Sequence, residues 1–140
     1  MSSTLYLLDT NTVSYAIAGR SDMLRRKLIE AESNGQLAIS VITEAEHLFG
    51  FAKKPKAVRQ QEAYERFRAG IRVFAWDSAA ARSYGVLRQR LNAAGKSLDA
   101  LDLLIAAHAV SLDAVLISSD KAFEQVRSFV NVVNWATDLK

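Results

Sequence analysis

Short apolar segments alternate with longer amphipathic ones along most of the chain, and this alternation restricts the fold more than any other feature. The first apolar segment, residues 5–8, stops at Asp9, and similar β-rich segments recur between helix-like stretches. Alternating strands and helices are typical of a parallel sheet, because each crossover helix returns the chain to the same end of the sheet. Such a sheet is covered on both faces, so its strands are continuously apolar. The sequence therefore predicts an α/β fold, an α/β/α sandwich with a central, mostly parallel sheet of about five strands.

Periodicity and stop signals place the individual elements. We expect strands over residues 5–8, 37–42, 73–76, 114–117 and 130–133. We expect helices over residues 12–18, 21–34, 43 to about 53, after Pro55 to about 71, from 77–78 to Gly95, 101–111 and 121–126. A chain of 140 residues without internal repeats has room for one domain, so residues 1–140 are predicted to form a single domain.

Composition and missing motifs exclude several classes of protein. The chain has no cysteine, which excludes disulfides, thiolate nucleophiles and Cys-ligated metals. The phosphate-binding loops GxxxxGKS/T and GxGxxG and the nucleophile elbow GxSxG are absent. The most apolar stretch, residues 101–117, is interrupted by Asp102, His108 and Asp113, and the first apolar segment has no basic region before it. We therefore expect a cytoplasmic protein that does not bind a membrane.

Four acidic residues occupy comparable positions relative to the expected strands. Asp9 follows the first strand, Glu46 lies in the first turn of the helix after the second, and Asp120 follows the fourth. In a parallel sheet these positions share the carboxyl edge, where such sheets bind ligands. Asp102 opens the apolar helix before the fourth strand, and it joins the others if that helix starts at the same edge.

Each of these acids also has a purely structural interpretation as a helix cap. Asp9 and Asp120 precede expected helices, and residues 43–46 match a capping box in which Glu46 reaches back to a backbone amide. Asp99 and Asp102 have the same three-residue spacing. Taken together the capping interpretation is weaker, because Asp102 enters a mostly buried helix and several gathered carboxylates repel one another unless a cation offsets them.

A hard divalent cation is the natural partner of such a cluster. Mg²⁺ and Mn²⁺ prefer carboxylate and water oxygens, and a bound cation can orient a phosphate and activate a water molecule. The two histidines do not suggest a different chemistry, since His108 lies on the apolar helix and His47 next to Glu46. Without a histidine pair, attack by metal-activated water is favoured over attack by an internal 2′-hydroxyl group.

Five segments, in order along the chain, resemble a known family. Residues 7–11 (LLDTN) are similar to the opening of the PIN-domain ribonucleases, specifically the VapC toxins of bacterial toxin–antitoxin pairs. The later similar segments are S-x-x-T-x-A-E-x-x-x-G at residues 40–50, DLLIAAHA at 102–109, LISSD with Phe123 at 116–123, and VNW at 133–135. The sequence departs mildly from the family pattern: His47 replaces a usual Leu, Ser118 stands where Thr is common, and position 120 is often Asn.

The resemblance has implications for the site, the cofactor and the partners. Asp9 and Asp102 fall on the principal metal-binding acids of the family, Glu46 rather than Glu44 on its glutamate, and Asp120 on its fourth acid. The resemblance implies an endoribonuclease that uses Mg²⁺, or Mn²⁺ as a substitute, and inhibits translation. It also implies silencing by a VapB-like antitoxin and a homodimer that assembles with this antitoxin into a hetero-oligomer.

The basic residues fit a nucleic-acid partner without proving one. The formal net charge is +3, from 18 basic and 15 acidic residues. Among the candidates for phosphate contacts we prefer Lys53, Lys54 and Lys56, which close the helix that carries Glu46. Two alternatives remain beside the nuclease: a PIN-like module that binds nucleic acid or a partner without cutting, and a receiver-type signalling domain. The receiver requires adjacent acids after the first strand, where this chain has Leu8-Asp9.

Overall fold

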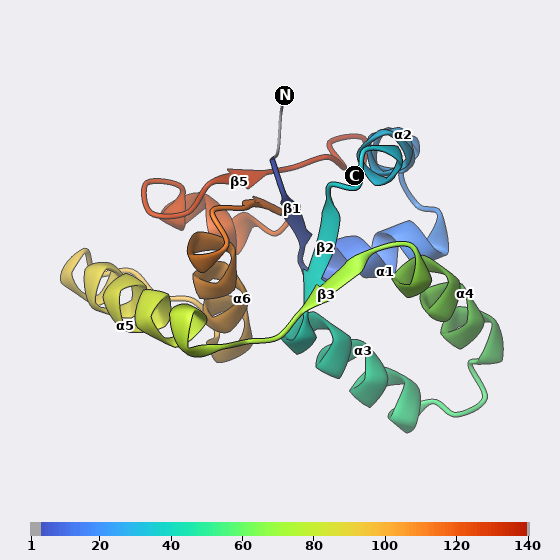
Figure 1. The fold of residues 1–140 in the computed structure, drawn as a ribbon, viewed down its shortest axis with the longest axis horizontal. Coiled ribbons are helices and arrows are strands. Elements are labelled where there is room, and N and C mark those ends of the chain that lie inside the picture. Colours follow the sequence, from blue (N-terminus) through green and yellow to red (C-terminus); the bar gives the residue numbers. More distant parts are fainter. Residues whose placement is uncertain (1–3, 140) are drawn as a thin grey trace.

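A computed structural model describes residues 4–139 and contains one five-stranded parallel sheet with the order β3-β2-β1-β4-β5 (Figure 1). The strands are β1 Tyr6–Leu8, β2 Leu37–Ser40, β3 Arg72–Phe74, β4 Val115–Ile117 and β5 Val132–Val133. The helices are α1 Thr10–Ala18, α2 Asp22–Ser33, α3 Val41–Lys53, α4 Val58–Ala69, α5 Ser78–Ala93 and α6 Ala100–Ser111, with the 3₁₀ helix η1 Lys121–Val126. The predicted fold class is confirmed, including the number of strands.

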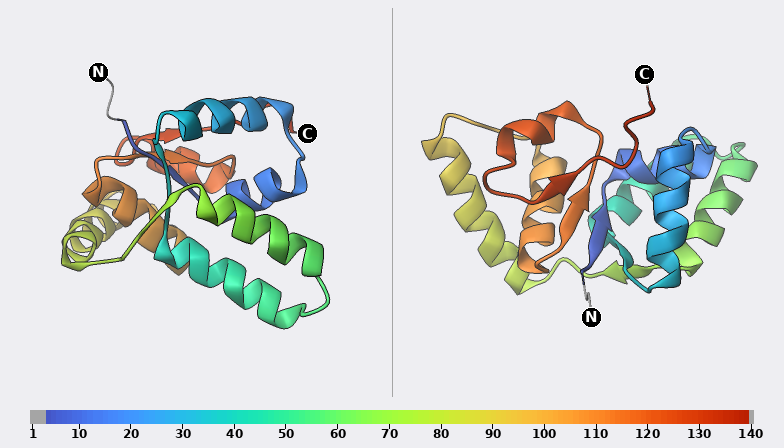
Figure 2. Two further views of the ribbon diagram at one scale, coloured as in Figure 1. Left: turned by 45° about the vertical axis from the view of Figure 1, so that its right-hand side comes forward. Right: turned by 90° about the horizontal axis from the view of Figure 1, so that it is seen from above.

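The strands direct alternate residues to two separate apolar clusters. Leu7 packs with residues of α5, α6 and η1, whereas Leu8 packs with residues of α1, α2 and α4. Figures 1 and 2 show α5 and α6 together on one side of the sheet and α1, α2 and α4 on the other. Because successive strand side chains point to opposite faces, the fully buried pair Leu7 and Leu8 contributes to both clusters.

The junction between β2 and α3 differs from the sequence prediction. We expected the strand to include Val41 and Ile42, but both residues belong to the first turn of α3. The Ser40 hydroxyl accepts a hydrogen bond from the backbone N–H of Ile42 at 3.0 Å and so caps the helix. A serine can end a strand and cap a helix at the same position, and here that effect outweighs the β preference of Val41 and Ile42.

Helix starts elsewhere follow the predicted bounds more closely. Ser21 and Asp77 cap α2 and α5, through hydrogen bonds to the backbone N–H groups of Leu24 and Ala80. α1 begins at Thr10, two residues earlier than expected, because Asp9 is its cap. Within residues 4–139 no helix is long and apolar enough to cross a membrane.

Candidate functional site

The order in which the chain adds strands to the sheet reverses next to β1, and this position defines the candidate site. From β1 the chain adds β2 and β3 on one side, then returns to add β4 and β5 on the other. Ligands of open α/β sheets bind outside the carboxyl ends of the strands at such a reversal. Asp9 directly follows β1, and Asp120 follows β4 after two serines. Backbone pairing continues between these loops, since the N–H of Asp9 donates to the carbonyl of Ile117 at 3.1 Å.

Asp9 is buried and held by hydrogen bonds to both of its carboxylate oxygens. Its Oδ1 accepts from the backbone N–H of Thr12 at 2.8 Å, and its Oδ2 accepts from the Ser118 hydroxyl at 2.5 Å. The side chain is 3% exposed, and this burial raises its pKa against the opposing effect of the hydrogen bonds. Asp9 therefore caps α1, as the structural interpretation proposed. Each carboxylate oxygen still has a free lone pair for a further ligand.

Glu46 lies in the second turn of α3 and not in the first as predicted, because the helix begins at Val41, and its side chain is oriented by α1. The Thr10 hydroxyl donates to its Oε1 at 2.5 Å. The residue that follows Asp9 in the chain therefore positions Glu46. The capping-box interpretation is wrong, because Ser40 rather than Thr43 caps α3. Glu44 turns away from the site and pairs with Arg68 of α4 at 2.7 Å. Of the two glutamates, Glu46 is therefore the one that contacts the segment directly after Asp9.

Asp102 completes the group from the first turn of α6. Its pKa is raised to about 6, first by burial and then by the negative charges of Asp120, Asp9, Asp99 and Glu46. The indole N–H of Trp76, two residues after β3, donates to the carbonyl of Leu104 at 3.0 Å, so the start of α6 lies at the carboxyl edge of the sheet, which is the condition that the sequence left open. Asp99 precedes α6 but makes no capping hydrogen bond through its side chain.

Ser118 is the member of the site that sequence reasoning did not identify as functional. This serine is 3% exposed. Its hydroxyl donates to Asp9 and accepts from the backbone N–H of Asp120 at 3.1 Å, so it joins the two acids. The Oδ1 of Asp120 in turn accepts from the N–H of Ala122 at 2.9 Å and caps η1. The family pattern contained the signal, because a hydroxyl residue is usual at position 118.

The donor set of this cluster suits a hydrated divalent cation. Its acidic side chains offer hard carboxylate oxygens. Burial is the main cause of the raised pKa values of Asp9 and Asp102, and neighbouring carboxylates add to it, while no Lys or Arg in the described segment forms a salt bridge with either acid. Among residues 4–139, no group of three or more His, Asp and Glu side chains is already arranged to hold a metal ion. A Mg²⁺ ion is commonly held by one or two carboxylates and retains several waters, so the residues fit this mode of binding.

Both histidines have structural hydrogen bonds instead of catalytic positions. The His47 ring lies 3.2 Å from the carbonyl oxygen of Thr10 through Nε2 and stacks on Tyr64 at 5.1 Å between centroids. His108 is buried, and its Nδ1 lies 2.8 Å from the Ser40 hydroxyl. Burial lowers the pKa of each imidazole, so both are neutral near pH 7.

Comparison with known proteins gives similarities over nearly the whole chain. The PIN domain family matches residues 6–128. The chain is 31% identical to Ribonuclease VapC2 of Rickettsia felis, over 94% of this chain and 98% of that protein. It is 29% identical to the tRNA(fMet)-specific endonuclease VapC of Shigella flexneri, over 86% of this chain and 91% of that protein.

Solved structures extend these similarities to the fold. The crystal structure of VapBC2 from Rickettsia felis, bound to a DNA fragment from their promoter, matches with a TM-score of 0.85 and 30% identity, over 94% of this chain and 99% of that chain. The structure of VapBC-1 from nontypeable Haemophilus influenzae matches with a TM-score of 0.81 and 28% identity, over 94% and 98% of the two chains.

Proposed function

This chain belongs to the PIN-domain family and, within it, to the VapC ribonucleases, and from that premise we propose that it is a divalent-metal-dependent endoribonuclease and the toxin of a VapBC-type pair. The observation that carries the proposal is the convergence of Asp9, Glu46, Asp102 and Asp120 at the carboxyl edge of the sheet, at its reversal point. A binding module without catalysis has no need for carboxylates that repel one another.

In this proposal some side chains bind the cation, and others position these ligands through hydrogen bonds. Asp9 and Asp102 are the principal ligands in this proposal, with Glu46 and Asp120 nearby. Mg²⁺, or Mn²⁺ in its place, would supply positive charge that orients a phosphodiester and promotes ionisation of water. Thr10 and Ser118 fix the carboxylates of Glu46 and Asp9 through their hydroxyl groups. Attack of water on the phosphorus, with cleavage of the P–O3′ bond and protonation of the departing 3′-oxygen, leaves a 5′-phosphate and a 3′-hydroxyl. Detection of a 2′,3′-cyclic phosphate would contradict this mechanism.

The test is incubation of the purified chain with structured RNA, with Mg²⁺ and with a chelator. We expect cleavage only with the divalent cation. Asp9→Asn and Asp102→Asn each remove one carboxylate charge while keeping the size of the side chain, and both should lower cleavage by at least about 100-fold, in line with the loss of a group that stabilises developing charge. Their folded state should be intact by circular dichroism. Cleavage at the unsubstituted rate by either variant would refute the site assignment.

Silencing in this proposal comes from a VapB-like antitoxin, synthesised in the cytoplasm with the toxin. The solved relatives are VapBC toxin–antitoxin assemblies. A cluster of carboxylates is a receptor for a cationic side chain, and an arginine can bridge two carboxylates through parallel hydrogen bonds. We therefore place an arginine or lysine of the antitoxin beside Asp9, Glu46, Asp102 and Asp120. The active form is a homodimer that the antitoxin converts into a hetero-oligomer.

A further inference from the structure

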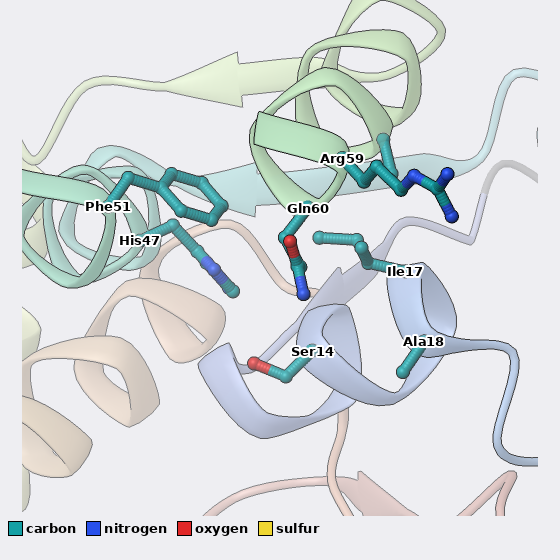
Figure 3. A pocket seen from close by; sticks show the side chains of 8 residues that line it. Ser14, Ile17, Ala18, His47, Phe51, Arg59 and Gln60 are labelled. Carbon is teal, nitrogen blue, oxygen red and sulfur yellow. The ribbon is translucent and has the colours of Figure 1, made fainter. Parts of the chain in front are cut away.

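A continuous groove runs from the acidic cluster between α1, α3 and α4. Its inner part is a pocket of about 480 Å³, which also includes Ile17 and Ala18 of α1 (Figure 3). A second hollow of about 360 Å³ includes Thr10 and Glu46 of the candidate site. Four residues line both hollows: Ser14, His47, Phe51 and Gln60. We call the two hollows together the α1–α3–α4 groove. Its position makes it the natural path for a substrate that extends beyond the reacting group.

The inner pocket presents flat apolar surface next to a free amide. Figure 3 shows Phe51 and His47 on one side and Ser14 facing them from α1, with Gln60 between. The stacking of His47 on Tyr64 holds the imidazole in place as part of the wall. The Gln60 side chain is exposed and makes no hydrogen bond with another residue of the described segment 4–139. A planar heterocycle can stack on such a wall while an amide contacts its polar edge.

The charge along the groove favours an anionic occupant. Lys53 and Lys54 line the hollow beside Glu46, and Arg59 lines the inner pocket. Within residues 4–139 the single salt bridge joins Arg68 to Glu44, so these three cations have no carboxylate partner there. The Lys53 ammonium lies 4.6 Å from the centre of the exposed Phe49 ring, but neither it nor the other two cations is neutralised. Cations without a carboxylate partner along a path from the acidic cluster match the phosphates of a nucleic-acid strand. An apolar peptide segment would leave these charges without a partner.

We propose that the α1–α3–α4 groove binds one unstacked nucleotide of the RNA adjacent to the cleaved phosphodiester. The base lies on Phe51 with its edge at Gln60, and the neighbouring phosphates contact Lys53 and Lys54. This inference rests on the proposed endoribonuclease function. Stacking tolerates every base, whereas a side-chain amide both donates and accepts hydrogen bonds and so distinguishes one base edge from another. The groove thereby contributes to the choice of cleavage site.

The test measures RNA binding by the full chain carrying Asp102→Asn, so that the probe is not cut. The probes are fluorescein-labelled single-stranded octamers r(A)8, r(U)8 and r(C)8 and an abasic ribose-phosphate octamer, measured by anisotropy. We expect the base-containing probes to bind about tenfold more tightly than the abasic one, which is the usual scale for stacking of a single base. Ala18→Trp, at an exposed position that lines only the inner pocket, should remove this advantage and leave abasic binding unchanged.

Further variants separate base contacts from phosphate contacts. Gln60→Ala should change the order of affinity among the three homopolymers, and because Gln60 is exposed this variant should fold even if Ala18→Trp does not. Lys53→Gln and Lys54→Gln should weaken all probes alike and reduce the dependence of affinity on salt. Val86→Trp is the matched control, because Val86 is 55% exposed and lines a separate hollow on α5. It should leave every affinity unchanged.

Three outcomes overturn the proposal. Unchanged binding of all probes by Ala18→Trp and Gln60→Ala would show that no base enters the groove. If these variants instead weakened only the complex with the co-expressed antitoxin, the groove would be assigned to a protein segment. In both cases Mg²⁺-dependent cleavage by the unsubstituted chain would leave the proposed function standing. Absence of both cleavage and RNA binding in the unsubstituted chain would refute that function and this inference together.

Discussion

Asp102 is a carboxylate whose electrostatic neighbours are other carboxylates, and this arrangement has a consequence for stability. Its pKa of about 6 in the folded chain exceeds the ordinary value of 3.8. The folded state therefore binds a proton at Asp102 more tightly than the unfolded state does. Ionised Asp102 lowers the free energy of unfolding, and this effect is fully present above about pH 6 and disappears toward about pH 4. In the absence of divalent cations, Asp102 destabilises the folded chain at neutral pH.

Asp102→Asn tests this effect by comparison of the two proteins across pH. At pH 7.5 without divalent cations, the variant should be more stable than the unsubstituted chain by about 1 kcal/mol, after allowance for solvent screening of a partly exposed group. The difference should shrink as the pH falls from about 6 to about 4, which urea unfolding at each pH would measure. The pKa values of the buried His47 and His108 are lowered, so protonation of these imidazoles on acidification also destabilises the folded chain. This effect is the same in both proteins and cancels in the comparison. A difference that did not depend on pH would contradict the assignment.

Ser118 acts through Asp9 and Asp120, so its hydroxyl group is the feature to change. Ser118→Ala leaves the partly buried Asp120 N–H without its acceptor and the buried Asp9 carboxylate without one donor. We expect a loss of about 1–3 kcal/mol of stability and a decrease of at least about tenfold in cleavage rate. Ser118→Thr retains the hydroxyl and should restore most of the rate. An alanine variant with the full rate of RNA cleavage would show that this hydroxyl does not position the acids.

At the scale of elements, the start of α3 connects β2 to α6. Ser40 is fully buried, and its hydroxyl caps α3 and contacts His108 of α6. Ser40→Ala removes both interactions and leaves a buried imidazole without this partner. The expected loss is about 2 kcal/mol in the free energy of unfolding, measured with urea.

Ser33→Ala is the control for Ser40→Ala. Ser33 is an exposed serine at the end of α2 whose hydroxyl donates only to the carbonyl of Glu30. Its replacement should change stability by less than about 0.5 kcal/mol. Equal effects of the two substitutions would mean that the connection between β2, α3 and α6 contributes nothing beyond local helix formation.

At the scale of the whole molecule, the prediction concerns growth of cells that express the chain. Induction of the unsubstituted chain without its antitoxin should arrest growth, and co-expression of the antitoxin should restore it. Asp9→Asn should not arrest growth at the same level of soluble protein, because the principal proposed ligand has lost its charge. Equal, unimpaired growth with both proteins would favour the alternative of a PIN-like module that binds without cutting.

The sequence alone determined the fold class, because apolar strand segments that alternate with helices permit few arrangements other than a parallel sheet covered on both faces. It also placed Asp9 and Asp120 at one edge, since the carboxyl ends of parallel strands coincide. The capping signals at Ser21 and Asp77 were local and therefore readable. The resemblance to the PIN-domain ribonucleases selected Glu46 over Glu44.

Only the tertiary structure decided which local signals prevailed and which distant groups meet. The capping box at residues 43–46 and the strand expected at 41–42 are both plausible from the local sequence. In the structure the buried Ser40 caps α3 and contacts His108 of the distant helix α6, so the helix begins at Val41 and neither local prediction holds. Asp102 could join the other acids only if α6 began at their edge, and that depends on how α6 packs. The hydrogen bonds from Thr10 to Glu46 and from Ser118 to Asp9 join residues 36 and 109 positions apart. No local pattern encodes such pairs, because their geometry results from the packing of whole elements around the sheet.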